Sequence, residues 1–229
     1  MPPLPEGNVP GWQLERQLWD RGVRTVIGVD EAGRGALAGP VTAAAVVLGF
    51  REDLPYRDSK TLRPQERERL ALELRETAVA AATGWASARE VDAFGVLAAT
   101  HAACRRALLA LDLRLEECGL VTDYLFLDHP GPVLAVPRAD ASSLQAAAAS
   151  ILAKTARDAY MTRLSWAEGA YGFDTNRGYG SRAHLDALDR HGPGAHHRLT
   201  YAPVAGRLCG AAASGYNARI RTTQRSPRP

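Results

Sequence analysis

The chain has 229 residues, of which 46% are hydrophobic and 23% charged, and its formal net charge is +3. This is enough apolar sequence for one main domain with a small appendage, and no run of about 18 apolar residues suggests a membrane span. Its three scattered cysteines exclude a disulfide framework or a zinc site, and no secretory signal is visible, so we expect a cytoplasmic protein.

Charge is distributed unevenly along the chain. From Arg190 onward there are seven arginines and no aspartate or glutamate. A basic end suits a polyanion such as nucleic acid, although a solvated arginine-rich terminus explains the pattern equally well. Residues 207–229 are rich in Gly, Ala, Arg and Pro, and we expect them to form a basic, poorly ordered tail.

Strands and helices are predicted to alternate along the rest of the chain. Residues 1–21 form a loose leader, with a short helix over 13–20. Strands are predicted at 23–30, 41–48, 83–88, 120–128 and 133–136. Further helices are predicted at 65–82, 94–111, 143–166 and 181–191. This interleaving indicates the α/β class.

Three local signals support the helix ends. Pro64 suits the first turn of the helix that follows it. Ser142 and Gln145 have the spacing of a capping box at the start of the alanine-rich helix. Gly192-Pro193 ends the last helix.

Asp30 and Glu31 are the strongest functional signal, because two adjacent carboxylates end an apolar strand. Each raises the pKa of the other unless positive charge lies between them. A divalent cation supplies such charge, since hard cations prefer oxygen ligands. Gly33 and Gly35 follow on either side of Arg34, and their missing side chains would let the backbone approach a ligand closely. The pattern indicates metal-assisted chemistry on a phosphate backbone.

The two acids belong to a longer motif, residues 28–40 (GVDEAGRGALAGP), and six further motifs follow it in order. These six are residues 58–60 (DSK), 127–128 (LD), 149–158 (ASILAKTARD), 171–173 (YGF), 178–181 (GYGS) with His184, and 197–198 (HR) with Pro203-Val204. Together the motifs resemble ribonuclease HII over about residues 23–204. The resemblance implies a ribonuclease H-like mixed sheet with helices on both faces and a small helical C-terminal subdomain. Its domains would be a catalytic domain at 22–166 and the subdomain at 167–206.

The resemblance also implies four metal ligands. They are Asp30, Glu31, Asp128 and Asp158. Taken alone, Asp128 is as well explained as a turn cap at a strand end, and Asp158 as an ion-pair partner of Lys154 or Arg157. One departure is that His129 follows Asp128, where the family usually has glycine after its third acid. The cations would be Mn²⁺ or Mg²⁺, with two ions holding the scissile phosphate.

Substrate contacts are implied in the same way. The Gly33-Arg34-Gly35 loop would read the ribose 2′ hydroxyl through its backbone, and Tyr179 would stack on the sugar at an RNA-to-DNA junction. Ser59, Lys60 and Arg177 would contact phosphates near the cut. We expect His184, His197 and Arg198 to serve packing and polar ties within the C-terminal subdomain.

The implied activity is that of a monomeric endoribonuclease that hydrolyses the RNA strand of RNA–DNA hybrids. It would also cut 5′ of ribonucleotides embedded in duplex DNA, leaving 3′-hydroxyl and 5′-phosphate ends. Three alternatives stay open: a ribonuclease HIII, a catalytically silent nucleic-acid-binding module, and a small-molecule phosphatase. The short leader and Asp158 favour ribonuclease HII over HIII, and the retained acids disfavour a silent module, since carboxylates repel phosphate without a cation.

Overall fold

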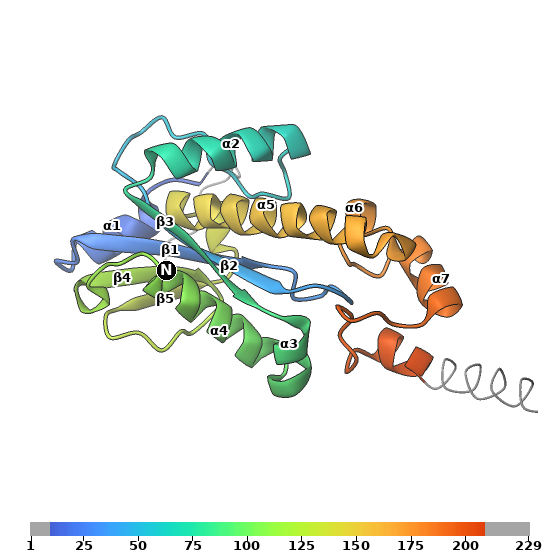
Figure 1. The fold of residues 1–229 in the computed structure, drawn as a ribbon. Coiled ribbons are helices and arrows are strands. Elements are labelled where there is room, and N and C mark those ends of the chain that lie inside the picture. The colour runs from blue at the N-terminus through green and yellow to red at the C-terminus, as the bar shows by residue number, and fades with distance from the viewer. Residues whose placement is uncertain (1–9, 209–229) are drawn as a thin grey trace, which may run out of the picture. The chain divides into compact units, whose positions relative to one another are not determined.

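A five-stranded mixed sheet is the centre of the computed structural model, in which residues 10–208 are described. Its strand order is β3-β2-β1-β4-β5 (Figure 1). The strands are β1 (Thr25–Ala32), β2 (Val41–Val47), β3 (Ala80–Ala86), β4 (Cys118–Asp123) and β5 (Val133–Val136). β1 pairs antiparallel with β2 and β2 with β3, whereas β1–β4 and β4–β5 are parallel. The predicted mixed sheet is therefore confirmed.

Helices connect these strands and cover the sheet. The α-helices are α1 (Gln13–Trp19), α2 (Pro64–Thr77), α3 (Ala88–Phe94), α4 (Val96–Leu109), α5 (Leu144–Ala167), α6 (Phe173–Asn176) and α7 (Arg182–His191). Short 3₁₀ turns are η1 (Leu115–Glu117), η2 (Ala139–Ala141) and η3 (Gly169–Tyr171), and residues 202–208 are also helical. Within residues 10–208, no helix has the length and apolar character needed to cross a membrane.

The described chain divides into two compact units. The first comprises residues 10–34 together with Pro40–Ala159, and the second comprises Gly35–Gly39 together with residues 160–208. The division falls inside α5, before the expected boundary at 166/167. A continuous helix carries no linker-like composition, so sequence could not mark this position. The second unit is helical and has its own apolar core around Phe173, Met161 and Leu188.

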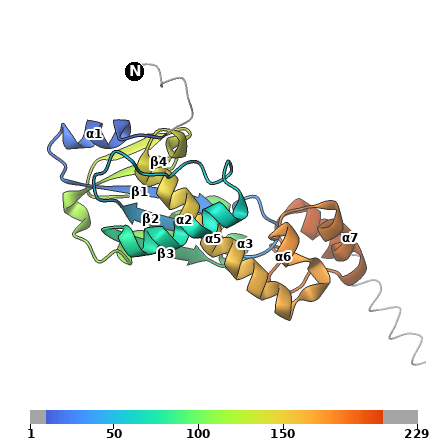
Figure 2. The same cartoon turned by 90° about the horizontal axis from the view of Figure 1, so that it is seen from above.

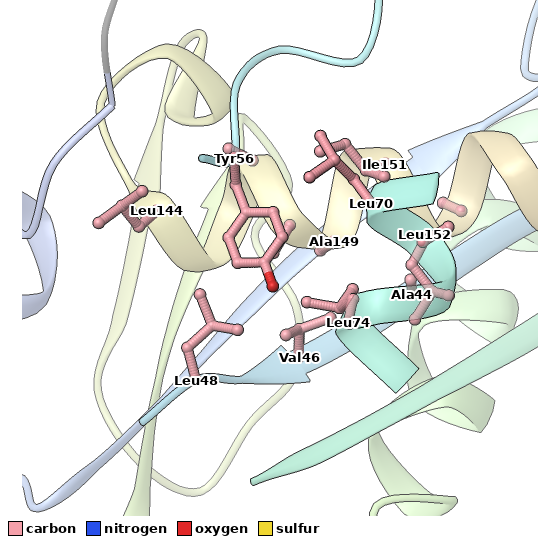
Figure 3. Packing of buried hydrophobic residues seen from close by; sticks show 14 of the residues in the cluster. Ala44, Val46, Leu48, Tyr56, Leu70, Leu74, Leu144, Ala149, Ile151 and Leu152 are labelled. Atoms are coloured by element: carbon pink, nitrogen blue, oxygen red, sulfur yellow. The ribbon is translucent and has the colours of Figure 1, made fainter. Parts of the chain in front are cut away.

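Helices lie on both faces of the sheet in the first unit. α2 and the first part of α5 pack on one face, where Val46 of β2 shares an apolar cluster with Leu74 and Leu152 (Figure 3). Gly28 of β1 allows this packing, because a Cβ there would lie 2.1 Å from the backbone of Gln145. α4 packs against β2 and β3 from the opposite side (Figures 1 and 2). Apolar residues on both faces explain why the central strands are almost completely buried.

The structure corrects several predicted boundaries. The helix predicted over 94–111 is α4, which spans Val96–Leu109. The preceding helix α3 was not predicted, and Gly95, with φ +82°, separates the two. The helix predicted over 65–82 ends at Thr77, and the strand after it starts at Ala80. The strand predicted over 120–128 ends at Asp123. The predicted tail from 209 onward lies outside the described residues.

The capping prediction at α5 is wrong by one residue. Ser143, not Ser142, accepts the backbone N–H of Ala146, with an N···O distance of 3.0 Å. Ser142 instead ends the short turn η2. Ser143 also donates its hydroxyl to the buried carboxylate of Glu15 in α1, so the cap joins the leader helix to α5.

Candidate active site

Asp30 and Glu31 lie near the end of β1, in the middle of the sheet. Successive side chains of a strand point to opposite faces, so Asp30 shares the α5 face with Gly28 whereas Glu31 points the other way. Asp30 is only 7% exposed. Burial raises the pKa of Asp30 well above its ordinary value, and the negative charges of Glu31, Asp140 and Asp123 raise it further.

Asp123 is the acid that the sheet places beside Asp30. β1 and β4 run parallel with Val29 opposite Thr122, so Asp30 and Asp123 follow at the same end of the two strands. The Oδ1 atom of Asp123 accepts the backbone N–H of Arg138 at 2.6 Å. This hydrogen bond ties the end of β4 to the segment that leads into η2.

Asp140 is the fourth acid of this group and is 3% exposed. It lies in η2, two residues after the Arg138 backbone group that holds Asp123. Burial raises the pKa of Asp140 to about 6, and the nearby charge of Asp58 adds to the rise while Lys60 opposes it. The Nζ atom of Lys60 lies 3.8 Å from Oδ2 of Asp140, which is an ion-pair distance but too long for a hydrogen bond.

The structure corrects the placement expected for Asp128. The chain reverses after Asp123, and His129 reaches the carbonyl of Cys118 with an N···O distance of 2.9 Å. Cys118 starts β4 and Asp123 ends it, so the two lie about 16 Å apart at the ordinary rise of a strand. Asp128 therefore lies toward the opposite end of β4, where it lines a cavity with His101 of α4.

The structure also corrects the expected role of Asp158. Its carboxylate accepts a hydrogen bond from Lys154 at 2.8 Å and lies 3.6 Å from the guanidinium of Arg67. Asp158 thus forms the ion pair with Lys154 that the spacing along α5 allows. The acids that perturb Asp30 are Glu31, Asp140 and Asp123.

A backbone feature makes Asp123 a candidate for the third acid of the motif. The resemblance places glycine after this acid, and Tyr124, which follows Asp123, has φ +56°. Few residues other than glycine adopt this left-handed conformation readily. Tyr124 therefore has the backbone conformation that a glycine after this acid would favour, whereas the ring of His129 contacts Cys118 at the start of β4. The sequence pattern extends the strand through residues 124–127 because these residues are largely apolar.

The glycine-rich loop starts directly after β1. Gly33 has φ +93°, and a Cβ there would lie 2.0 Å from Nε of Arg157. Arg157 is fully buried and donates from Nε to the carbonyl of Pro40 at 2.9 Å. Gly35 has neither constraint, since no atom lies within 4 Å of its Cβ position. Arg34 donates to Oε1 of Glu31 at 3.1 Å, which opposes the rise that burial imposes on the pKa of Glu31.

Ser59 and Lys60 differ in their surroundings. Ser59 is 3% exposed, and its hydroxyl shares a hydrogen bond with that of Ser150 at 2.7 Å. This contact ties the loop before α2 to α5. The side chain of Lys60 is 79% exposed, and the charges of Asp58 and Asp140 raise its pKa despite partial burial. Lys60 is thus a cation beside the acid cluster, whereas Ser59 is a packing residue of the loop.

Arg177 and Tyr179 belong to the second unit. Arg177 has φ +53° and donates to the hydroxyl of Thr162. Tyr179 is 36% exposed, and its backbone N–H bonds to the carbonyl of Asn176 at 2.9 Å. The predicted polar ties of His184, His197 and Arg198 are confirmed. His184 and His197 bond to each other, and Arg198 donates to the carbonyl of Gly39.

Two oxygens of the acid cluster suit a cation. Oε2 of Glu31 and Oδ2 of Asp140 are buried and have no hydrogen-bond partner. Buried carboxylate oxygens of this kind are the atoms that a divalent cation binds directly. Among residues 10–208, no three Asp, Glu, His or Cys side chains are grouped closely enough to hold a metal ion as they stand. The donor types of the acid cluster nevertheless fit a divalent cation.

The sheet order and the acids at its centre define a ribonuclease H-like α/β nuclease. The family described as Ribonuclease HII matches residues 27–204. A Ribonuclease HII of Thermus thermophilus is 52% identical over 192 residues, which cover 84% of this chain and 93% of that protein. The chain belongs to the ribonuclease HII family and is an endoribonuclease of the ribonuclease H type.

Solved structures show the same fold. The ribonuclease H2 of Pyrococcus horikoshii OT3 superposes with a TM-score of 0.68 at 24% identity, covering 80% of this chain and 97% of that one. A Bst-RNase HIII solved in complex with Mn²⁺ gives a TM-score of 0.63 at 20% identity, covering 82% of this chain and 70% of that one. The predicted ribonuclease H-like fold is confirmed.

Proposed function

We propose that the chain cuts on the 5′ side of a ribonucleotide, both in RNA–DNA hybrids and where single ribonucleotides are embedded in duplex DNA. The products would carry 3′-hydroxyl and 5′-phosphate ends. The observation that supports this proposal is the meeting of Asp30, Glu31, Asp123 and Asp140, which come from three separate segments of the chain. Such a group of buried and half-buried carboxylates is electrostatically costly unless it binds a cation.

These four acids would hold Mn²⁺ or Mg²⁺, two ions being present with substrate. Their support is the pair of buried oxygens without hydrogen-bond partners on Glu31 and Asp140. When bound, such cations supply positive charge that stabilises the attacking and leaving oxygens of a phosphodiester. The Mn²⁺ complex of Bst-RNase HIII, a protein of the same fold, is consistent with this choice of metal.

The protein's own groups would then position the substrate. The exposed ammonium of Lys60, which lies 3.8 Å from Asp140, would meet a phosphate as a point charge. The backbone of the Gly33–Gly35 loop would read the ribose 2′ hydroxyl, which separates RNA from DNA. Arg177 would contact a phosphate, and the partly exposed ring of Tyr179 would stack on the sugar at an RNA-to-DNA junction. Ser59 would act indirectly, by holding its loop to α5 through Ser150.

A cleavage assay on labelled duplexes tests the proposal. The substrates are a DNA duplex with one ribonucleotide, the same duplex without it, and an RNA–DNA hybrid, each titrated with Mg²⁺ and Mn²⁺. We expect cutting of the first and third substrates, metal dependence, and loss of turnover in Asp30→Asn with substrate binding retained. Turnover in Asp30→Asn, or equal cutting of the all-DNA duplex, contradicts the proposal. Light scattering in the same buffers checks whether the active protein is a monomer, as we expect.

A further inference from the structure

Two buried histidines meet in the second unit without any part in the proposed chemistry. His184 of α7 is 0% exposed and His197 is 2% exposed. Their Nε2 atoms lie 3.0 Å apart, and the rings pack against Tyr171 and Phe173. A buried imidazole needs a partner for each nitrogen, so the partners of the two Nδ1 atoms decide how the protons are placed.

The hydrogen-bond partners favour one arrangement of protons in the neutral pair. Nδ1 of His184 lies 2.9 Å from the carbonyl of Tyr179, which can only accept, so His184 carries its proton on Nδ1. Its Nε2 is then an acceptor, and His197 must donate from Nε2. Nδ1 of His197 in turn accepts the backbone N–H of Gly194 at 2.9 Å. The result is a directed chain from Gly194 through His197 and His184 to Tyr179.

The opposite arrangement of His197 is unfavourable. The carbonyl of Gly194 also lies 3.3 Å from Nδ1 of His197, and it could accept a proton placed there. Two unprotonated Nε2 atoms would then face each other at 3.0 Å and repel. Burial keeps both rings neutral, because it lowers the pKa of His184 and lowers that of His197 to about 4.

The chain of hydrogen bonds ends on the turn that presents Tyr179. The carbonyl of Tyr179 accepts a second hydrogen bond, from the backbone N–H of Ser181 at 2.8 Å. The hydroxyl of Ser181 caps α7 by accepting the backbone N–H of His184 at 3.2 Å. The Tyr179 backbone is therefore fixed by the helix that carries His184, while its ring stays 36% exposed.

We propose that His184 and His197 are positioning residues, which hold the Tyr179 backbone so that its ring meets the substrate sugar. This inference rests on the proposed contact of Tyr179 with the substrate. His184 donates directly to the Tyr179 carbonyl, and His197 keeps His184 in the tautomer that can donate. Neither histidine touches the reacting phosphate.

Matched substitutions at His184 test the contact with Tyr179. In His184→Asn the side-chain amide replaces Nδ1 and can still donate, whereas His184→Leu removes the donor. We expect His184→Leu to lower kcat/KM on a duplex with one embedded ribonucleotide by about tenfold, and His184→Asn to restore it to within about threefold of the wild type. The loss of kcat/KM on a long RNA–DNA hybrid should be smaller, because a hybrid can be cut at many positions that have no RNA-to-DNA junction.

A double-mutant cycle with Tyr179→Ala separates positioning from general folding. If His184 acts through Tyr179, adding His184→Leu to Tyr179→Ala lowers kcat/KM no further. The proposal is overturned if kcat/KM of the double variant falls by the product of the two single losses. It is also overturned if folded His184→Leu keeps the wild-type kcat/KM. Circular dichroism and thermal melting establish that each variant is folded.

Histidine ¹⁵N NMR of the wild-type protein gives a readout that needs no variant. We expect His184 protonated on Nδ1 and His197 protonated on Nε2 at pH 7.5. Any other pair of tautomers overturns the proposal, whether or not the variants fold. Failure of the proposed function is distinguishable, since the wild-type protein would then fail to cut either substrate while the tautomers stayed as stated.

Discussion

Asp30 and Asp123 lie at the same end of two neighbouring parallel strands, each following the last paired residues Val29 and Thr122. They are far apart in the sequence, and only the β1–β4 pairing brings them together. Asp140 joins them because the backbone N–H of Arg138 binds Asp123. The negative charges of Asp123 and Asp140 both raise the pKa of Asp30, because the three carboxylates lie close together.

The first prediction compares Asp123 with Asp128. Asp123→Asn removes a proposed cation ligand, so kcat/KM should fall by at least about 100-fold. Asp128→Asn changes an exposed residue toward the other end of β4, and its activity should stay within about twofold of the wild type. Steady-state cleavage of a duplex with one ribonucleotide measures both. A larger loss of kcat/KM in Asp128→Asn than in Asp123→Asn would mean that Asp128 is the third acid.

The second prediction compares Asp140 with Asp158. Asp140→Asn should abolish Mn²⁺-dependent turnover and weaken Mn²⁺ binding in a calorimetric titration. Asp158→Asn breaks the pairs with Lys154 and Arg67, so it should cost about 1 kcal/mol of unfolding free energy and leave Mn²⁺ binding intact. Equal loss of Mn²⁺ binding in both variants contradicts the assignment.

The third prediction concerns the glycine-rich loop. Gly33→Ala places a methyl group against the buried Arg157 at a positive φ, so it should destabilise the fold by about 2 kcal/mol or more. Gly35→Ala is the matched control, because nothing lies within 4 Å of its Cβ position and its φ is not in the left-handed region. Urea unfolding of both variants checks the difference. Equal urea midpoints for the two variants would mean that the Arg157 side chain shifts at no cost in unfolding free energy.

The fourth prediction concerns Glu15, which is fully buried and accepts hydrogen bonds from Ser143 and Gln145. Burial raises its pKa from 4.5 to about 7. The folded state therefore binds the proton more tightly than the unfolded state, and ionised Glu15 destabilises the fold above pH 7. The contribution of Glu15 to the free energy of unfolding rises as pH falls from about 7 to 4.5, by at most about 3 kcal/mol.

Glu15→Gln keeps the acceptor oxygen and removes the charge, which makes it the control for this titration. We expect the variant to be more stable than the wild type at pH 8, and the advantage to shrink as pH falls toward 4.5. Chemical unfolding of both proteins at several pH values, in EDTA, gives the difference. A constant difference across this range would show that Glu15 does not titrate there.

Much of the fold follows from local sequence. The positions of β1, β2, β5, α5 and α7 follow from apolar runs, alanine-rich periodicity and the Gly192-Pro193 stop, which are local features. Helix α3 is missing from the prediction although Ser87 and Glu90 have capping-box spacing, and a positive φ at Gly95 separates α3 from α4. The end of β4 is hidden from the sequence pattern, since apolar Leu125 and Leu127 continue the strand pattern beyond Asp123 although the chain has already turned.

By itself, the sequence determined the α/β class, the ribonuclease HII family and the two adjacent acids on β1, because each depends on residues close together in the chain. Tertiary structure decided which distant acids join them. Asp123, Asp128, Asp140 and Asp158 all lie in or near predicted elements, and a carboxylate shifts the pKa of another only when the two lie within a few ångströms. The parallel pairing of β4 with β1 and the hydrogen bond from Arg138 bring Asp123 and Asp140 within that range, whereas chain reversal carries Asp128 away and Lys154 engages Asp158.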